Sequence, residues 1–452
     1  MTPLRVVVIG GGIAGLSAAH ALRRRARTEA HPLELRVLEA SHQAGGHVGS
    51  VRESGFVVER GPNGFLSGEP ATESLIEQLG LGRLLVEARP ASKRRFLVRD
   101  GRLCELPLSP LGLFTTAALS VPGRLRLALE PWIPRRQSAA EESVFDFGRR
   151  RFGREAAELL ADAVVGGTSA GDATTLSMRA AYPALVEMER AHGSLVKGLL
   201  ARRKARRPAP LLRSFVGGMA TLTDALAGEL GPTLSLGDAV TRLVPESGGW
   251  RVERANAEPI RADRVVLALP AIRAAELLRQ SVPPLGAALA SVPNAGLVAV
   301  AFAWRASELG RPLDGYGYLV PRREGLFTLG MVWESSLFPG RAPEGWVLVR
   351  LMLGGARAPG VAALAEPELL QLAEAEARRF LGNRRPPSHA WLFRWPAAIP
   401  QYLKGHEERV AAIRDAAGAA GGIELCGSSY DGISFNTALA SGAAAGERLE
   451  LA

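Results

Sequence analysis

The feature that most constrains the fold is an apolar run near the N-terminus that ends in a glycine-rich turn. Leu4–Ile9 has the sequence LRVVVI, and Gly10, Gly12 and Gly15 follow with the spacing G-x-G-x-x-G. A β-branched apolar run predicts a strand that is buried on both faces. The first glycine permits a tight turn, the second admits a pyrophosphate, and the third lets a helix with free N–H groups pack on the strand. The candidate cofactor-binding residues of this turn are Gly10, Gly11, Gly12, Ile13, Ala14, Gly15 and Leu16.

The next apolar stretch ends in an acidic residue. Leu33–Leu38 predicts a second strand, and the carboxylate of Glu39 at its end can accept the hydroxyls of a ribose. Glu39 lies 24 residues past Gly15, slightly beyond the usual ~20, and the polar stretch 23–32 lengthens the connection. Strand, glycine turn, helix, strand and acid occur in the order of a dinucleotide-binding unit. This order favours the interpretation as a cofactor site over a simple turn.

The residues after Glu39 distinguish between cofactors. Ala40, the glycine pair Gly45 and Gly46, and His47 follow within a short distance. This segment resembles the extended FAD signature of the amine-oxidase and protoporphyrinogen-oxidase superfamily, in which a second glycine pair follows the ribose-binding acid. A nicotinamide-dependent dehydrogenase has no reason to carry this pair. The resemblance implies FAD, held non-covalently because no matched residue offers an attachment point.

Composition excludes several classes of protein. The chain has 452 residues, of which 47% are hydrophobic, and could hold two or three domains. Its formal charge of +10 is nearly all arginine, and without a nucleic-acid-binding motif we expect no nucleic acid partner. The two cysteines are too scattered for a disulfide framework, the seven histidines form no cluster, and no metal is expected. We expect no signal peptide before the first strand and no membrane-spanning helix.

Further motifs, spread over nearly the whole chain, are similar to those of the oxygen-dependent protoporphyrinogen oxidases within this superfamily. They are Gly61–Asn63, Lys93–Phe96, Gly167–Asp172, Gly315–Pro321, Met352–Gly355 and Ile399–Tyr402. No single motif identifies the group, but their order and spacing together do. The resemblance implies a six-electron oxidation of protoporphyrinogen IX to protoporphyrin IX in heme biosynthesis, in three two-electron rounds. Each round would return electrons to O2 as hydrogen peroxide.

The resemblance also implies an α/β fold of three parts. These are a discontinuous Rossmann-like FAD-binding domain of the p-hydroxybenzoate-hydroxylase type, a mixed-sheet substrate domain and an inserted helical membrane-binding domain. The patterning agrees, because helix-like stretches dominate the middle of the first half and strand-like runs recur in the second half. We expect the FAD-binding domain at 1–88, 211–284 and 398–452, the helical insertion at 89–210 and the substrate domain at 285–397.

Two segments of the insertion bear on a membrane. The apolar, arginine-flanked segment 106–136 is equally consistent with core helices and with a face that dips into a bilayer without crossing it. The basic run 202–207 is either a solvated face or a contact for anionic lipid head groups. The resemblance implies a cytoplasmic protein that is peripherally associated with the inner face of the membrane, and it leaves a homodimer open.

The resemblance assigns five residues to the substrate. Arg95 would pair with a propionate, which suits a planar guanidinium. Tyr316 and Leu319 would clamp the porphyrinogen ring on one side, and Gly167 would leave space on the other. Met352 would line the apolar slot.

The remaining implied cofactor contacts come from later segments of the chain. In the loop that would face the flavin, Asn63 is the only polar candidate for orienting the substrate, and no side chain is an evident general base. One departure concerns the closing motif, where the group usually has Asp and Cys after its Asn. Here Asn436 is followed by Thr437 and Ala438, so the flavin contacts of that segment are in doubt. The implied contacts are Gly61, Pro62, Asn63, Gly64, Val240, Trp395, Gly432, Ile433 and Ser434.

Three other functions remain open at this point. The nearest is the oxidation of coproporphyrinogen III to coproporphyrin III by the same fold, because the number of propionates cannot be inferred from the sequence. Amine or carotenoid oxidoreductases of the superfamily come next, although Cys426 precedes the segment at which amine oxidases often attach flavin. A flavoprotein that carries a tetrapyrrole without turnover is the third.

Overall fold

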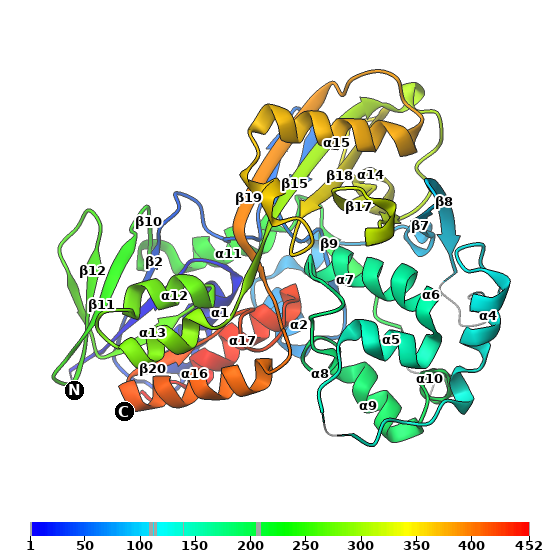
Figure 1. Cartoon of the computed structure of the whole chain (residues 1–452). Coiled ribbons are helices and arrows are strands. Elements are labelled where there is room, and N and C mark those ends of the chain that lie inside the picture. Colours follow the sequence, from blue (N-terminus) through cyan, green and yellow to red (C-terminus); the bar gives the residue numbers. More distant parts are fainter. Residues whose placement is uncertain (1, 108–111, 113–114, 139, 205–208, 452) are drawn as a thin grey trace.

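The computed structural model describes residues 2–107, 112, 115–138, 140–204 and 209–451 (Figure 1). The predicted strand–turn–helix–strand unit is present at its N-terminal end. It consists of β1 (Leu4–Ile9), α1 (Ile13–Thr28) and β2 (Leu33–Glu39). The unit belongs to a five-stranded parallel sheet of order β10-β2-β1-β14-β20. The three other strands are β10 (Leu234–Leu236), β14 (Arg264–Leu267) and β20 (Ile423–Leu425).

Strand β1 is buried on both faces, as its composition predicts. Val6 and Val8 pack with helices α1, α11 (Ala220–Leu230) and α17 (Phe435–Arg448). Val7 and Ile9 point the other way, into the core that contains α12 (Ala271–Leu278), α13 (Pro283–Ala290) and α16 (His406–Ala420). The sheet therefore has helices on both faces, as in a doubly wound α/β fold.

The stretch 234–269 forms five strands that belong to two sheets. β11 (Val240–Glu246), β12 (Gly249–Arg254) and β13 (Ile260–Ala262) make an antiparallel meander. β10 precedes this meander, β14 follows it, and both belong to the parallel sheet. The left-handed backbone of Gly237 (φ 69°) separates β10 from β11 and lets the chain change sheets.

A second sheet of seven strands has the order β19-β15-β18-β17-β16-β7-β8. Its neighbours are antiparallel except for β16 and β7, so the sheet is mixed. Helix α15 (Glu366–Leu381) packs on it (Figure 1). Its strands are β7 (Arg95–Arg99), β8 (Arg102–Leu106), β15 (Asn294–Arg305), β16 (Gly317–Leu319), β17 (Thr328–Val332), β18 (Trp346–Gly354) and β19 (His389–Pro400).

The first two strands of this sheet come from the segment 89–210, which the patterning assigns to the helical insertion. The hairpin of β7 and β8 reaches the sheet because Phe96 and Leu97 pair with Tyr318 and Leu319 of β16. This long-range pairing places Arg95, at the start of β7, in the seven-stranded sheet next to β16.

The rest of the insertion is helical and lies below the seven-stranded sheet, and the helices that cover the parallel sheet separate it from that sheet (Figure 1). Its core contains a fully buried ion pair, in which Arg151 bonds Glu130, and Glu130 also accepts the Leu195 N–H at 2.9 Å. No helix in the described part of the chain is long and apolar enough to cross a membrane. The main helices of the insertion are α4 (Val121–Ala128), α5 (Val144–Phe152), α7 (Asp162–Ser169), α9 (Pro183–His192) and α10 (Leu195–Lys204).

Candidate active site

The glycines of the first turn have different neighbours. Gly10 has φ 107°, and a Cβ there would lie 2.6 Å from the Ala268 carbonyl oxygen. A Cβ on Gly15 would lie 1.9 Å from the Gly10 carbonyl oxygen. Backbone atoms therefore leave no room for a side chain at Gly10 or Gly15. A Cβ on Gly12 would meet nothing nearer than 4.0 Å. Gly12 precedes α1 with no side-chain cap, so the first N–H groups of the helix are available to a phosphate.

Glu39 lies beside this turn. Its carboxylate accepts hydrogen bonds from the N–H of Gly11 at 2.6 Å and of Ser41 at 2.8 Å, next to the exposed Ala40. The N–H of Asp238 donates to the Glu39 carbonyl at 2.9 Å, which brings the start of β11 and Val240 to this end of the sheet.

The second glycine pair packs against the first turn. Gly45 and Gly46 have positive φ angles of 106° and 59°, and the Gly45 N–H donates to the Gly11 carbonyl at 2.7 Å. A Cβ on Gly46 would lie 3.2 Å from the Gly12 Cα. The two glycine segments therefore form one backbone surface around Gly12.

The loop Gly61–Gly64 is held by the segment after this pair. A Cβ on Gly61 would lie 2.1 Å from the His47 carbonyl oxygen. The rings of His47 and Trp395 are in edge contact at 4.7 Å, and the Trp395 Nε1–H donates to the Arg60 carbonyl at 2.9 Å. Burial, with a smaller contribution from Arg60, lowers the pKa of His47. The expected cofactor residues His47, Gly61 and Trp395 are therefore in direct contact.

The C-terminal segment approaches the same region. The Gly432 N–H donates to the Tyr402 hydroxyl at 2.8 Å, and Ser434 caps α17 by accepting the Thr437 N–H at 3.1 Å. A Cβ on Gly442 of α17 would lie 2.0 Å from the Ala14 carbonyl oxygen, so α17 packs tightly on α1. Thr437 contributes to this cap with its backbone N–H and with its hydroxyl, which donates to the Ser434 carbonyl at 2.9 Å, so the cap forms despite the departure from the motif.

Asn436 has a structural contact that sequence reasoning missed. Its Nδ2 donates to the Leu66 carbonyl at 2.7 Å, and its Oδ1 accepts the Thr72 hydroxyl at 3.1 Å. The side chain thus ties α17 to the first segment of the chain. Ile433 packs beside the core of the insertion, and Cys426 is fully buried, which raises the pKa of its thiol to about 12.

Three of the expected site residues, from separate segments of the chain, form a continuous row. The Arg95 guanidinium is exposed and lies over the Tyr316 ring, 4.9 Å from its centroid. The Asn63 side chain lies close enough to the Tyr316 hydroxyl to lower its pKa, but Asn63 Nδ2 is buried and makes no hydrogen bond. Burial raises the pKa of Tyr316, so its hydroxyl stays neutral. The row leads from an exposed cation to the loop that contains Pro62.

The expected apolar residues Leu319 and Met352 lie on β16 and β18, the two neighbours of β17 in the seven-stranded sheet. Leu319 Cδ2 would be 2.3 Å from a Cβ on Gly167, so Leu319 covers Gly167 directly. Leu319 and Met352 both pair with Gly330 of β17, and therefore lie on one face of the sheet. Sequence reasoning missed Gly330, although a glycine inside a strand signals a close approach. A Cβ there would lie 2.7 Å from the Tyr318 carbonyl oxygen.

Two buried ion pairs beside the site were also missed. Arg357 pairs with Asp162 at 3.0 Å and fills the space next to Gly166. Arg350 pairs with Glu334 at 2.9 Å and also donates to the Gly61 carbonyl. An arginine inside the apolar strand WVLVRLMLG is the signal that could have drawn attention to this second pair.

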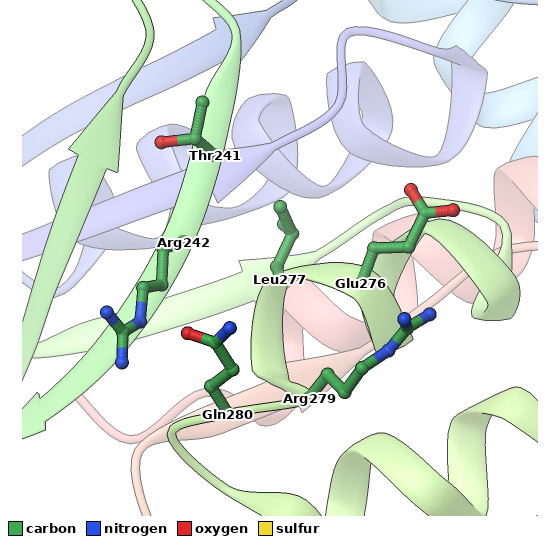
Figure 2. Close-up of a pocket in the computed structure, with 6 residues that line it drawn as sticks. All are labelled: Thr241, Arg242, Glu276, Leu277, Arg279 and Gln280. Carbon is green, nitrogen blue, oxygen red and sulfur yellow. The ribbon is translucent and has the colours of Figure 1, made fainter.

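A separate surface hollow of about 230 Å³ lies between β11 and the end of α12 (Figure 2). It contains none of the expected site residues, and its lining is mostly polar. The residues that line it are Thr241, Arg242, Glu276, Leu277, Arg279 and Gln280.

Comparison with known proteins finds similarity over nearly the whole chain. The family model of flavin containing amine oxidoreductase matches residues 13–449. Human protoporphyrinogen oxidase is 32% identical over 97% of this chain and 96% of its own length. The coproporphyrinogen III oxidase of Bacillus subtilis is 28% identical over 97% of this chain and 96% of its own.

Solved structures show the same fold. One from Exiguobacterium sp. 255-15, which carries the name protoporphyrinogen oxidase, has a TM-score of 0.87 at 25% identity and covers 100% of this chain and 99% of its own. A reduced UDP-galactopyranose mutase has a TM-score of 0.75 at 14% identity, covers 99% of this chain and 93% of its own, and shares the fold alone. The chain belongs to the flavin containing amine oxidoreductase family and is an FAD-dependent oxidase similar to the protoporphyrinogen oxidases.

Proposed function

We propose that the protein oxidises protoporphyrinogen IX to protoporphyrin IX with O2 as the electron acceptor. The substrate loses six electrons and six protons over three rounds, and three O2 molecules become three H2O2. The observation that carries this proposal is the row Arg95–Tyr316–Asn63, which joins an exposed guanidinium to the loop Gly61–Gly64. A large apolar ring edged by carboxylates matches such a row.

The residues around Gly12 fit FAD. The open space above Gly12 and the uncapped start of α1 suit a pyrophosphate, while Glu39 is placed for the ribose. Asn63 Nδ2 is a buried donor without a partner, as expected beside a polar ring system. When bound, FAD supplies the chemistry of accepting two electrons from a substrate and passing them to oxygen.

The residues of the chain would bind and orient the porphyrinogen. Arg95 would pair with a propionate at the exposed end, since a guanidinium and a carboxylate can form two parallel hydrogen bonds. Tyr316 would present its ring to the substrate and its neutral hydroxyl to Asn63. Leu319 and Met352 would supply the apolar face that excludes water. Leu319 must move off Gly167 to admit a flat ring.

Coproporphyrinogen III is the second candidate, favoured by the similarity to the Bacillus subtilis enzyme named for it. The test is a fluorescence assay of the purified FAD-bound protein with both porphyrinogens side by side, with a parallel measurement of H2O2. A higher kcat/KM for protoporphyrinogen IX supports the proposal, and a higher value for coproporphyrinogen III replaces it with the second candidate. If the flavin stays oxidised when porphyrinogen is added in the absence of oxygen, both oxidase functions are contradicted. This result would favour a flavoprotein that carries a tetrapyrrole without turnover.

We also propose peripheral contact with a membrane through one face of the insertion. Val121, Leu125, Leu129 and Trp132 are exposed at helical spacing on α4 and the 3-10 helix η3 (Glu130–Trp132), with Leu125 at 64% and Trp132 at 77% exposure. Arginines at 124 and 135 flank this stripe and suit anionic head groups. Residues 205–207 of the basic run lie outside the described residues, as do the side chains of 203 and 204.

The test is flotation with anionic lipid vesicles. The double variant Leu125→Ser with Trp132→Ser should lose most of the bound fraction, because both side chains would bury apolar area in the bilayer. Leu364→Ser removes an exposed leucine elsewhere and is the matched control. Equal flotation of the double variant and the control would exclude this face.

A further inference from the structure

A buried ion pair lies behind the loop Gly61–Gly64. Glu334, at the start of α14 (Glu334–Leu337), is 1% exposed, and Arg350 of β18 is 4% exposed. Arg350 Nε bonds Glu334 Oε1 at 2.9 Å, and an Nη1–H of Arg350 donates to the Gly61 carbonyl. The other carboxylate oxygen, Glu334 Oε2, is buried without a partner.

The surroundings of this pair are themselves charged. Glu59 and Arg341 form a second buried pair at 3.0 Å, in which Glu59 also accepts the Ser50 hydroxyl at 2.6 Å. Arg95 lies beyond the Tyr316 ring on the exposed side. Burial raises the pKa of Glu59 to about 7. Arg350 and Glu334 compensate each other, so removal of either one leaves an uncompensated charge next to the loop.

Burial of two charges costs several kcal/mol, which the mutual attraction of an ion pair offsets only with good geometry. Such a pair contributes little stability compared with apolar side chains of the same size. Arg350 does, however, reach across from the substrate sheet to the backbone of Gly61, beside Asn63. Its position therefore suits an electrostatic role better than a role in stability.

We propose that Arg350 and Glu334 are a positioning pair that sets the reduction potential of the bound flavin. Arg350 holds the loop Gly61–Gly64 and brings a positive charge toward the flavin, and Glu334 offsets part of that charge. This inference rests on the flavin lying against the loop, as in the proposed function, but it does not depend on the identity of the substrate.

Replacement of either member of the pair should shift the reduction potential of the flavin, and the two shifts should have opposite signs. Glu334→Gln keeps the shape of the side chain and removes a negative charge, so Arg350 should favour the reduced, more negative flavin and raise the potential. Arg350→Gln removes the positive charge and should lower the potential. We expect about a tenfold change in the equilibrium constant for each, or ~30 mV for a two-electron couple. Loss of packing alone would not give shifts of opposite sign.

The experiment is an anaerobic reductive titration of the FAD-bound protein against a reference dye, followed by the absorption of the flavin. No porphyrinogen is needed, so a protein that fails to oxidise porphyrinogens can still be tested. Glu376→Gln is the matched control, because Glu376 is a buried carboxylate on α15 that accepts the N–H groups of Phe327 and Thr328 at 3.0 Å. The flavin in the Glu376→Gln variant should have the same reduction potential as in the parent protein.

An unchanged or lowered potential in Glu334→Gln would overturn the proposal, whatever Arg350→Gln shows. Arg350→Lys keeps the positive charge but lacks the planar guanidinium. Its flavin potential should lie closer to that of the parent than to that of Arg350→Gln. If Glu334→Gln does not fold, the two arginine variants decide. Equal potentials in Arg350→Gln and Arg350→Lys would then reject the role of the charge.

Discussion

The proposed nucleotide half and the proposed substrate half of the site are built from different parts of the chain. Around Gly12 the walls are backbone atoms of the first turn, the second glycine pair and the end of β2. Around Tyr316 the walls are side chains that come from the loop Gly61–Gly64, the seven-stranded sheet and the insertion. Backbone walls cannot yield to an added side chain, whereas side-chain walls can rotate. Substitutions around Gly12 should therefore cause large losses of stability or cofactor affinity. Substitutions around Tyr316 should cause smaller, graded changes in KM.

The largest effect should come from Gly15→Val, because its Cβ would lie 1.9 Å from the Gly10 carbonyl oxygen. The turn and α1 would have to separate, which we expect to destabilise the protein by about 3 kcal/mol or more. The midpoint of urea unfolding of the protein prepared without FAD measures this. A midpoint equal to that of the parent would mean that this turn is not rigid.

Gly12→Val separates cofactor binding from folding. Its side chain would enter the open space beside the turn, where the Gly45 oxygen and the Gly46 Cα are the nearest atoms, both 4.0 Å from the Cβ. We expect affinity for FAD to fall at least about a hundredfold, or ~2.7 kcal/mol, because the valine would occupy the approach of the pyrophosphate. The unfolding midpoint of the FAD-free protein should be close to that of the parent, in contrast to Gly15→Val. Normal FAD affinity would place the pyrophosphate elsewhere.

This difference between the two halves also decides what the sequence could predict. The spacing of Gly10, Gly12 and Gly15 determines a local backbone conformation, and the alternating burial of β1 follows from its composition. Such features depend on residues close in the chain, so the strand, turn and helix are confirmed. The helices on both faces of the sheet follow from the same pattern.

The substrate half depends on contacts between distant residues. Arg95, Tyr316 and Asn63 could be grouped only through their resemblance to known motifs, because the pairing of β7 with β16 is not visible in either segment alone. The bond from Arg350 to Gly61 joins residues 289 positions apart, and no local pattern indicates it. The closure of Gly167 by Leu319 is likewise a matter of packing between separate elements.

Within the substrate half, the largest effect should come from Arg95. Arg95→Ala would remove a charge-assisted contact with a propionate, of roughly 1.5–3 kcal/mol. This corresponds to a rise of about one to two decades in KM if the contact is equal in the ground and transition states. Arg95→Lys should recover part of the loss, since a point charge cannot form two parallel bonds. Steady-state kinetics with both porphyrinogens measures this, with FAD content as the control, and an unchanged KM would leave the propionate partner unidentified.

A smaller, graded effect is expected at Gly167. The methyl group of Gly167→Ala would meet Leu319 Cδ2, the flexible end of a side chain, so Leu319 would rotate toward the slot. We expect KM to rise about fivefold, or ~1 kcal/mol, with FAD binding unchanged. Adding Leu319→Ala should restore most of the loss. A double variant no better than Gly167→Ala alone would show that the two residues do not share one space.

The smallest effect concerns the segment that joins the two halves, where His406 stacks on Tyr402 with ring centroids 3.7 Å apart. Both ring nitrogens are buried without a partner. Burial, aided by Arg409 and opposed by Glu141, lowers the pKa of His406 from 6.5 to about 4. The unfolded chain therefore takes up a proton at pH 6 that the folded chain does not, and the folded state loses stability as the pH falls below about 6.5.

His406→Phe should remove this dependence while keeping the ring on Tyr402, because no hydrogen bond is lost. Between pH 8 and pH 6 the parent should lose about 0.8 kcal/mol more unfolding free energy than the variant. Urea unfolding of the FAD-bound proteins at the two pH values measures the difference, and His192→Phe, at an exposed position, controls for the loss of one imidazole. If His406→Phe keeps the dependence of the parent, the ring must gain a partner on protonation. The segment that contains Tyr402 and His406 would then adjust to the added charge, as the side chains around Tyr316 adjust to substitution. The rigid region would be limited to the turn around Gly12.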